Sequence, residues 1–574
     1  MKELWKFLRP YRRQCVLAPL MKMFEALLEL FIPLVVANII DVGIADSDAA
    51  LVWRMGAVLA GLAVAGLISS ITAQHFSAVA AVGASCGIRR ELMGRIEGYS
   101  YSQLDRHGAS TMINRMTNDI NQVQTGINLT LRLLLRSPFI VFGAMIMAFT
   151  VDSRAALIFA VAIPLLAIIV FAVTIYTIPL YKKAQAALDR VLGITRQNVT
   201  GIRVVRAFNM QENQVERFDN ENRALNDMQR FVGKLSALMN PLTYLIVDAA
   251  LIAIVWVGAK RVYAGVITAG AVVALVSYMS QILVELVKLA NLIITMTKSL
   301  ACFSRVSDML NSEVVASKDG VKQGAADCKY AIEFRDVSVR YERASADTLT
   351  GISFSVDKGA TVGIIGSTGS GKTSLVNLIP GFYAPHEGSV LVNGVDTRDW
   401  DQNSLRDNIG VVPQKAVLFT GTVRENMLWG KESATDDEII EALKTGQAWE
   451  FVKDKPGALD AAIGYQGQNL SGGQRQRLAI ARALVRKPEI LILDDSASAL
   501  DLATDARLRK AIASLSGVTT VIVSQRCASV LSADLIVVLD QGEMAGLGTH
   551  GELMETCGVY REIYYSQFPK EAAK

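Results

Sequence analysis

The stretch Gly366–Thr373 reads GSTGSGKT and decides the fold of the second half of the chain. It matches the phosphate-loop pattern G-x-x-x-x-G-K-[ST] at every fixed position. The apolar run Ala360–Ile365 predicts a strand before it, and Ser374–Ile379 predicts a helix after it. Backbone N–H groups of such a turn surround phosphate oxygens, and the helix N-terminus adds partial positive charge. We therefore expect a nucleotide-binding α/β domain in which Lys372 reaches the β- and γ-phosphates and Thr373 binds Mg²⁺.

Two further motifs lie beyond the phosphate loop. Glu489–Asp495 reads EILILDD, an apolar strand that ends in two carboxylates, and Asp494 is the expected partner of Mg²⁺. Leu470–Gln474 reads LSGGQ. Together with the phosphate loop, these motifs resemble the signature of ABC transporter ATPase domains.

The first half of the chain is much more apolar than the second. The hydrophobic share of 51% and mean hydropathy of +0.32 are averages over 574 residues, and they exclude a disordered, collagen-like or disulfide-scaffold protein. The apolar residues are concentrated in six stretches, each near the ~20 residues that a helix needs to cross a bilayer. These stretches are Cys15–Ile40, Met55–Val79, Leu133–Thr150, Ala155–Tyr176, Pro241–Gly258 and Ala271–Thr295. We expect an all-α six-helix transmembrane domain at 1–310, a linker at 311–328 and an α/β phosphate-loop domain at 329–574.

The charge of the connections predicts the orientation in the membrane. The two long connections, after the second and fourth spans, are rich in basic residues such as Arg89, Arg115, Lys182 and Arg203. The positive-inside rule places both connections in the cytoplasm, together with both termini and the ATPase domain. Both connections lack turn clusters, so we expect them to extend the spans as helices. The N-terminal MKELWKFLRPYRR is charged throughout and predicts an amphipathic helix on the inner surface rather than a cleavable signal.

Net charge and cysteine content exclude other classes of protein. With 58 Lys and Arg against 54 Asp and Glu, the net charge of +4 is too small to indicate a nucleic-acid partner. The six cysteines include no CxxC pair, which favours reduced thiols over a metal site or disulfide framework. The absence of a targeting extension favours a bacterial inner membrane, as a multi-pass protein.

Six spans followed by one ATPase domain resemble an ABC half-transporter of the exporter type. The resemblance implies ATP and Mg²⁺ as cofactors, the lipid bilayer as surroundings and a second half-transporter as partner. In that family, each ATP lies between the phosphate loop of one ATPase domain and the LSGGQ of the other. The resemblance implies that Tyr341 stacks on adenine and that Mg²⁺ is bound by Thr373, Gln414 and Asp494. Besides Tyr341, the implied ATP site contains Gly366, Ser367, Thr368, Gly369, Ser370, Gly371, Lys372, Thr373, Ser374 and Gln414. The resemblance further implies a signature for the partner's site at Leu470, Ser471, Gly472, Gly473 and Gln474, and a D-loop at Ser498, Ala499, Leu500 and Asp501.

The cytoplasmic connections carry a similar resemblance. Gly201–Phe208, GIRVVRAF, resembles the second cytoplasmic loop of exporters. Such loops end in short coupling helices that dock on the ATPase domains. The first loop is matched by Asp105, Gly108, Arg115, Asn118 and Asp119.

Two positions depart from the family's catalytic pattern. The family has Glu after the Mg²⁺-binding Asp, where it polarises the attacking water, but this chain has Asp495. The family also has a His after the next strand, in contact with the γ-phosphate, but this chain has Gln525. Asp is one methylene shorter than Glu, and Gln cannot carry the positive charge available to His. We expect a degenerate site in a heterodimer, in which this chain lends an intact LSGGQ to a competent partner. A homodimer with slow ATPase activity, or an engineered substitution, is the alternative.

The transported compound is less clearly marked. Ionisable residues inside spans are costly and often functional, so the substrate candidates are Glu25, Glu29, Asp248 and Glu285. The alternative is that these charges pair between helices. We expect export of amphipathic compounds such as drugs or lipids. An importer of siderophore-like compounds on the exporter fold, or a channel-like or regulatory ABC protein, remains open.

Overall fold

The computed structural model describes residues 2–312, 320–325, 327–342 and 344–568. Its contacts divide the chain into two compact units. The first unit contains Met1–Glu97 and Ala109–Ser312, and the second contains Gly98–Gly108 and Glu313–Lys574. A short segment from within the first half of the sequence therefore packs with the second half. The expected linker at 311–328 lies partly outside the described residues.

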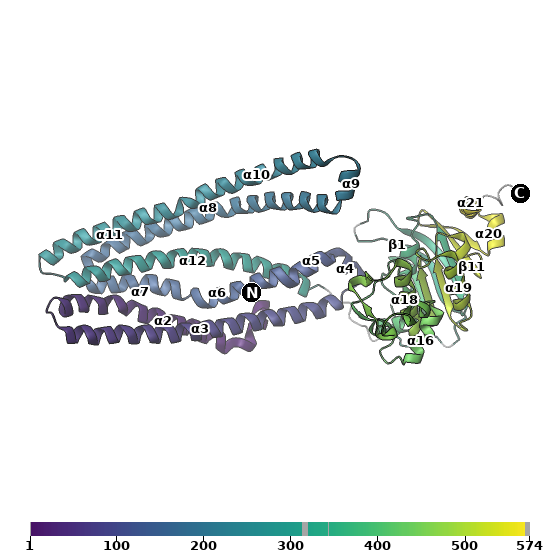
Figure 1. The fold of residues 1–574 in the computed structure, drawn as a ribbon, viewed down its shortest axis with the longest axis horizontal. Helices are drawn as coiled ribbons and strands as arrows, with labels where there is room; N and C mark the ends of the chain where they lie inside the picture. Colours follow the sequence, from purple (N-terminus) through teal and green to yellow (C-terminus); the bar gives the residue numbers. More distant parts are fainter. Residues whose placement is uncertain (1, 313–319, 326, 343, 569–574) are drawn as a thin grey trace. The chain divides into compact units, whose positions relative to one another are not determined.

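The first unit is helical, and six of its helical segments are long and apolar enough to cross a membrane. These segments are Glu3–Ile44, Ala49–Glu97, Ala109–Val151, Ser153–Thr200, Gln211–Tyr263 and Ala269–Leu310. The expected six spans are confirmed, and so are their helical extensions. The helices are α1 (Lys2–Leu8), α2 (Arg12–Asn38), α3 (Ala49–Glu97), α5 (Ala109–Asn114), α6 (Ile120–Leu133), α7 (Arg136–Val151), α8 (Ser153–Thr200), α9 (Ile202–Ala207), α10 (Gln211–Ala237), α11 (Met239–Tyr263) and α12 (Ala269–Leu310) (Figure 1).

The lengths of these helices explain why they extend beyond the membrane. At ~1.5 Å per residue, the longest helices, α3 and α8, run for about 70 Å, whereas the hydrocarbon layer is only ~30 Å thick. Charged residues concentrate in the part beyond the apolar windows, where α8 and α10 continue as a pair joined by α9 (Figure 1). The sequence keeps its helical period while its composition changes from apolar to charged.

The core of the first unit lies where α7, α8, α11 and α12 meet α2. Phe159, Ile254, Leu275 and Tyr278 are fully buried there. The Tyr278 hydroxyl donates a hydrogen bond of 2.8 Å to the carbonyl oxygen of Leu30, so the one polar atom of this ring is satisfied. This bond fixes α12 against α2 inside an apolar core, where an unpaired hydroxyl is costly.

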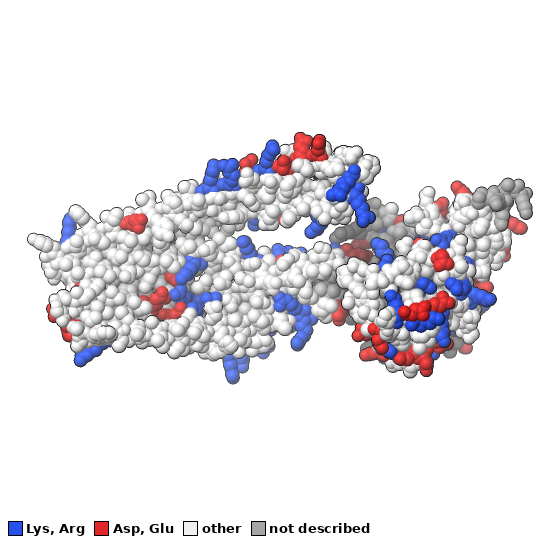
Figure 2. Space-filling view, in the orientation of Figure 1, with Lys and Arg blue, Asp and Glu red and all other residues white. Residues whose placement is uncertain are grey.

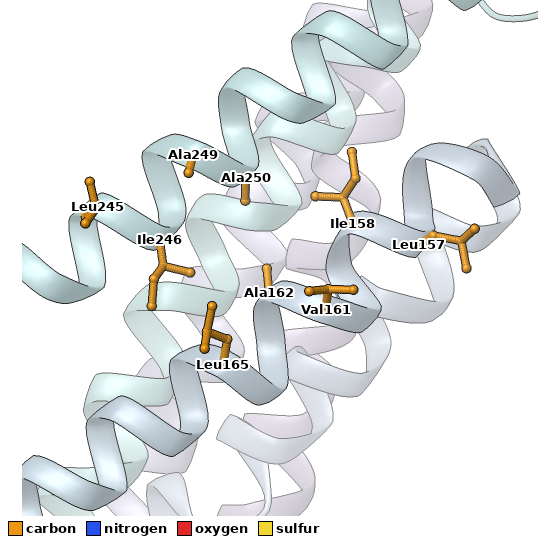
Figure 3. Close-up of a pocket in the computed structure, with 9 residues that line it drawn as sticks. All are labelled: Leu157, Ile158, Val161, Ala162, Leu165, Leu245, Ile246, Ala249 and Ala250. Carbon is orange, nitrogen blue, oxygen red and sulfur yellow. The ribbon is translucent and has the colours of Figure 1, made fainter.

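The outer surface of α8 and α11 carries an aliphatic groove of about 640 Å³ (Figure 3). Leu157, Val161 and Leu165 of α8 line one side, and Leu245 and Ile246 of α11 line the other. Aliphatic side chains of this kind suit contact with hydrocarbon rather than with water.

The second unit contains two principal sheets. A six-stranded sheet has the order β12-β11-β3-β10-β9-β6, in which β12 is antiparallel to β11 and the other pairs are parallel. A four-stranded antiparallel sheet has the order β2-β1-β4-β5. The strands are β1 (Tyr330–Val339), β2 (Leu349–Asp357), β3 (Thr361–Gly366), β4 (Glu387–Val392), β5 (Val395–Asp396), β6 (Ile409–Val412), β9 (Ile490–Asp494), β10 (Thr519–Val523), β11 (Leu535–Asp540) and β12 (Glu543–Gly548), with a separate pair of β7 (Gly421–Thr422) and β8 (Ala462–Ile463).

Helices flank these sheets and complete the expected α/β class. They are α4 (Tyr101–His107), α13 (Lys372–Val376), α14 (Gln402–Asp407), α15 (Val423–Leu428), α16 (Asp436–Thr445), α17 (Trp449–Lys453), α18 (Gly472–Val485), α19 (Leu502–Ala513), α20 (His550–Thr556) and α21 (Gly558–Gln567). β9 is buried along its whole length, as expected for an inner parallel strand covered on both faces. The carboxyl ends of β3, β10 and β9 meet at one edge of the sheet, and the site is built there.

One close helix contact in the first unit gives a test of the packing. A Cβ on Gly126 in α6 would overlap the Cβ and Oγ of Ser299 in α12. We expect Gly126→Ala to lower the thermal midpoint of the purified protein, because overpacking of this kind costs roughly 1–3 kcal/mol. Adding Ser299→Gly should restore the midpoint, since it removes the overlapping atoms. Gly94→Ala is the matched control, because nothing lies within 4 Å of its Cβ position. Equal midpoints for Gly126→Ala and Gly94→Ala would contradict this packing.

Candidate functional site

The phosphate loop connects β3 to α13, as the sequence predicts. Gly369 and Gly371 adopt left-handed backbone conformations, with φ of 85° and 94°, which glycine adopts without steric cost. Lys372 is 8% exposed, and its Nζ donates to the carbonyl oxygens of Gly366 at 2.9 Å and Ser367 at 2.6 Å. Burial lowers the pKa of Lys372, and the carboxylates of Asp495 and Asp494 oppose that shift. The loop thus holds the Lys372 ammonium group against carbonyl oxygens of its own backbone.

A hydrogen bond ties the loop to the end of β9. Thr373 Oγ1 donates to the carboxylate of Asp494, with distances of 3.2 and 3.0 Å to its two oxygens. β10 lies between the two strands and pairs Val523 with both Ile364 and Asp494, which sets the two strand ends level. Asp494 is 6% exposed. Burial raises its pKa, as does the charge of Asp495, while the Thr373 hydroxyl opposes both.

These side chains surround a cavity of about 240 Å³. Asp495 follows β9 with a φ of 45°, and its carboxylate accepts a hydrogen bond of 3.3 Å from Gln414 Nε2. Gln525 follows β10 and reaches the same cavity. The sequence therefore identified residues that the fold brings together. The lining consists of Thr348, Thr368, Gly369, Gly371, Lys372, Thr373, Ser374, Gln414, Asp494, Asp495, Val523 and Gln525.

The donor set fits Mg²⁺ held jointly with phosphate oxygens. No group of three or more His, Cys, Asp and Glu side chains among the described residues could hold a metal ion on its own. Mg²⁺ prefers hard oxygen ligands and is commonly held by one or two protein groups together with substrate phosphates. The Thr373 hydroxyl and the Asp494 carboxylate lie within hydrogen-bond distance of each other and supply such a pair.

Tyr341 lies beside the phosphate loop rather than in the lining of the cavity. Its hydroxyl donates a hydrogen bond of 2.9 Å to Ser374 Oγ. The edge of its ring meets Tyr383, with centroids 5.1 Å apart and planes at 87°. The Tyr383 hydroxyl in turn donates a 2.6 Å hydrogen bond to Asp105 of α4. Burial raises the pKa of Tyr383, and the bond to Asp105 raises it further.

α4 belongs to the second unit through these contacts. Tyr101 stacks on Phe382 with centroids 4.2 Å apart, next to the bond between Asp105 and Tyr383. The sequence singled out Asp105 but missed Tyr383; the adjacent aromatics of GFY at 381–383 were the only available signal.

The signature motif lies apart from the cavity within this chain. Ser471 caps α18 in a reciprocal capping box with Gln474, with bonds of 3.3 and 3.0 Å. Leu470 is buried, whereas Ser471 and Gly472 are exposed. Asp501 of the D-loop caps α19 by accepting a 2.8 Å bond from the N–H of Thr504. None of these residues lines the cavity, so the structure does not bring the motif to the phosphate loop of its own chain.

A side chain that sequence reasoning missed holds the segment around Gln525. Gln567, the last residue of α21, donates from Nε2 to the carbonyl oxygen of Gln525 at 2.8 Å. Its Oε1 accepts a bond of 2.8 Å from the N–H of Cys527. One amide group therefore fixes the backbone on both sides of Arg526. Because the contact joins distant segments, no local pattern in the sequence predicts it.

The substrate candidates divide into two groups. Glu25, Glu29 and Glu285 form ion pairs with basic residues of the membrane half: Lys22 with Glu25 at 2.6 Å, and Arg136 with Glu29 at 2.7 Å and Glu285 at 2.6 Å. Asp248, by contrast, lies on an exposed face of α11. Helix–helix pairing is thus present for three of the four candidates. Sequence reasoning missed Arg136, although a basic residue at the start of an apolar helix was a visible signal.

Comparisons with known proteins identify the family. The fold and the site define a membrane protein with a phosphate-loop nucleotide site. Residues 15–286 match the ABC transporter transmembrane region and residues 349–498 match the ABC transporter ATPase family. The chain therefore belongs to the ABC transporters, and its six spans fused to one ATPase domain make it a half-transporter of the exporter type.

Similar proteins cover the chain from end to end. The "Uncharacterized ABC transporter ATP-binding protein YfiB" of Bacillus subtilis is 36% identical over all of both chains. The "Putative multidrug export ATP-binding/permease protein YgaD" of the same species is 30% identical over 99% of each chain. The "ATP-dependent lipid A-core flippase" of Bordetella avium is 30% identical over 99% of this chain and 97% of its own. The structure of a bacterial Atm1-family ABC exporter with ATP bound is similar in fold, with a TM-score of 0.79 and 24% identity over 97% of this chain and 98% of that one.

These findings establish the general activity and location. The family's ATPase domain binds ATP, generally with Mg²⁺, and implies ATP hydrolysis coupled to transport. The six apolar helices and the bacterial relatives place the chain in the inner membrane as a multi-pass protein.

The contact of Gln567 gives a test at the site. We expect Gln567→Ala to speed hydrogen exchange at the Cys527 amide by about fivefold, because the loss of one such hydrogen bond is worth roughly 1 kcal/mol. Gln567→Glu should leave that amide protected, since it keeps the acceptor oxygen. Ser566→Ala is the matched control, because the Ser566 hydroxyl donates to the carbonyl oxygen of Ile563 within its own helix. Unchanged exchange in Gln567→Ala would contradict the contact.

Proposed function

We propose that this chain is the degenerate-site subunit of a heterodimeric exporter of amphipathic compounds. It binds Mg²⁺ and ATP at its own phosphate loop, hydrolyses that ATP slowly, and supplies Leu470–Gln474 to the competent site of a second half-transporter. The observation that carries the proposal is that both unusual residues, Asp495 and Gln525, line the same cavity as Lys372 and Thr373.

The geometry around Asp495 supports slow hydrolysis. The carboxylate follows the strand that ends in Asp494 and is held by Gln414 at 3.3 Å. The Asp side chain is one methylene shorter than that of Glu, so its carboxylate is displaced by about 1 Å from the position that orients water. Misplacements of that size cost ~10²-fold in rate. Binding of ATP is spared, because Lys372, Thr373 and the loop backbone contribute to it independently of Asp495.

Gln525 weakens the same step in a different way. A Gln side chain can donate one hydrogen bond to a γ-phosphate oxygen, but it cannot carry positive charge. Hydrogen bonds to charged groups are stronger when both partners are ionised, so the negative charge of the transferred phosphoryl group receives less stabilisation. Both departures act on the γ-phosphate, which supports a site that holds ATP rather than one that turns it over.

The exposed signature motif supports the need for a partner. In this family the motif completes the ATP site of the opposite ATPase domain, and Ser471 and Gly472 are exposed at the N-terminus of α18. An intact LSGGQ would be without use in a chain whose partner lacked a competent site. The charged residues within the membrane half, together with the apolar surfaces around them, support amphipathic compounds as cargo.

Restoring the family residues tests the degenerate site. We expect Asp495→Glu with Gln525→His to raise ATP hydrolysis by the purified chain by about 10²-fold, because the carboxylate and the charge then reach the γ-phosphate. Each single substitution should give a smaller gain, since both groups act on one step. Lys372→Ala in the restored background is the control and should abolish the gain. Brisk hydrolysis by the unmodified chain alone would contradict the proposal.

A further inference from the structure

Four side chains from three helices form a network of alternating charge in the membrane half. Arg136 of α7 contacts Glu29 of α2 at 2.7 Å and Glu285 of α12 at 2.6 Å. Lys288, one turn further along α12, contacts Glu285 at 2.8 Å. Ser137 also donates a 2.8 Å hydrogen bond to Glu285. The order of charges is therefore negative, positive, negative, positive, and the sum is zero.

The two middle side chains of this charge network are more buried than the two at its ends. The side chains of Arg136 and Glu285 are 8% and 4% exposed, whereas those of Glu29 and Lys288 are 38% and 44% exposed. Each exposed end uses one hydrogen bond among the described residues. A carboxylate offers about four lone-pair positions and an ammonium three donors, so both ends retain capacity. The buried pair therefore connects an exposed acidic pole on α2 to an exposed basic pole on α12.

The depth of this cluster places it in the inner half of the membrane. The short connections near Asp152 and Thr268 lie at the end of the spans away from the cytoplasm. At ~1.5 Å per residue, Glu285 lies about 24 Å along α12 from that end, and Arg136 about 22 Å along α7. The hydrocarbon layer is ~30 Å thick, so the cluster lies on its cytoplasmic side. A second pair, Lys22 with Glu25, continues along α2 towards the cytoplasm.

The exposed poles are unfavourable neighbours for lipid tails. A charged side chain that faces lipid tails is costly, so ionisable residues within spans almost always face the bundle interior or water. Figure 2 shows one group of blue and red side chains lying together within a largely uncharged part of the helical half. We therefore expect the exposed ends of the cluster to contact water, a polar ligand or another protein.

We propose that Glu29 and Lys288 form a binding site for the zwitterionic headgroup of an amphipathic substrate, a refinement that rests on the export function proposed above. The cationic group of the substrate contacts Glu29, its anionic group contacts Lys288, and its tail remains in the inner leaflet. A purely anionic headgroup gains at Lys288 but meets Glu29 and Glu285, and a purely cationic one meets Arg136 and Lys288. Only a headgroup with both charges matches both poles.

The test measures binding to the full-length chain in nanodiscs. Three fluorescent amphipaths share one tail and carry phosphoethanolamine, phosphoglycerol or trimethylammonium headgroups. The wild-type chain should bind the zwitterionic probe about tenfold more tightly than either other probe, because each charge-assisted contact is worth roughly 1.5 kcal/mol. Glu29→Gln should shift the preference towards the anionic probe, and Lys288→Gln towards the cationic probe.

Conservative and matched variants separate this role from a structural one. Lys288→Arg keeps the positive charge and should keep the preference. Arg190→Gln and Glu221→Gln alter an exposed pair outside the cluster, with atoms 3.0 Å apart, and should leave all three affinities unchanged. The thermal midpoint of each variant shows whether that variant folds. If Glu29→Gln unfolds, Glu29→Asp replaces it. Glu29→Asp should reduce the affinity for the zwitterionic probe without favouring the anionic probe.

The outcomes distinguish the two levels of the proposal. If the probes bind but Glu29→Gln and Lys288→Gln leave the order of affinities unchanged, or shift it in the same direction, the headgroup site is overturned while amphipath export stands. If no probe binds the wild-type chain, amphipath export and the headgroup site both fail.

Discussion

The hydrogen bond between Thr373 Oγ1 and the Asp494 carboxylate is the contact on which the nucleotide site depends. It joins the phosphate loop after β3 to the end of β9, across the intervening strand β10. Parallel strands of equal register bring their carboxyl ends to one edge, so the residues that follow each strand reach one cavity. Asp495 and Gln525 lie there for that reason, in the same cavity as Lys372.

The motif residues could be predicted from the sequence because each motif is local. The phosphate loop, EILILDD and LSGGQ each carry their own strand or helix context, and the parallel fold then fixes where their ends meet. No local sequence motif predicts the contacts between distant segments. Asp105 and Tyr383 are 278 positions apart, Arg136 and Glu285 are 149 apart, and Gln525 and Gln567 are 42 apart. The expected spans were also visible, because a helix in hydrocarbon needs a long apolar run.

The membrane half follows a second constraint, which is the cost of charge in hydrocarbon. Its ionisable residues are few, and Glu25, Glu29 and Glu285 are all paired with basic partners from the same unit. Pairing explains why the buried Arg136 and Glu285 are tolerated. Within the network that joins α2, α7 and α12, the two ends, Glu29 and Lys288, stay exposed, and the proposed headgroup site uses these two ends.

The central claim is the proposal that this chain hydrolyses its bound ATP far more slowly than its partner does. The most direct measurement compares photoaffinity labelling of the assembled transporter by 8-azido-ATP carrying the radioactive phosphate at the α or the γ position, under turnover with Mg²⁺. Both labels should remain on this chain, because its nucleotide stays a triphosphate, whereas the partner should keep only the α label. Loss of the γ label from this chain as fast as from its partner would contradict the account.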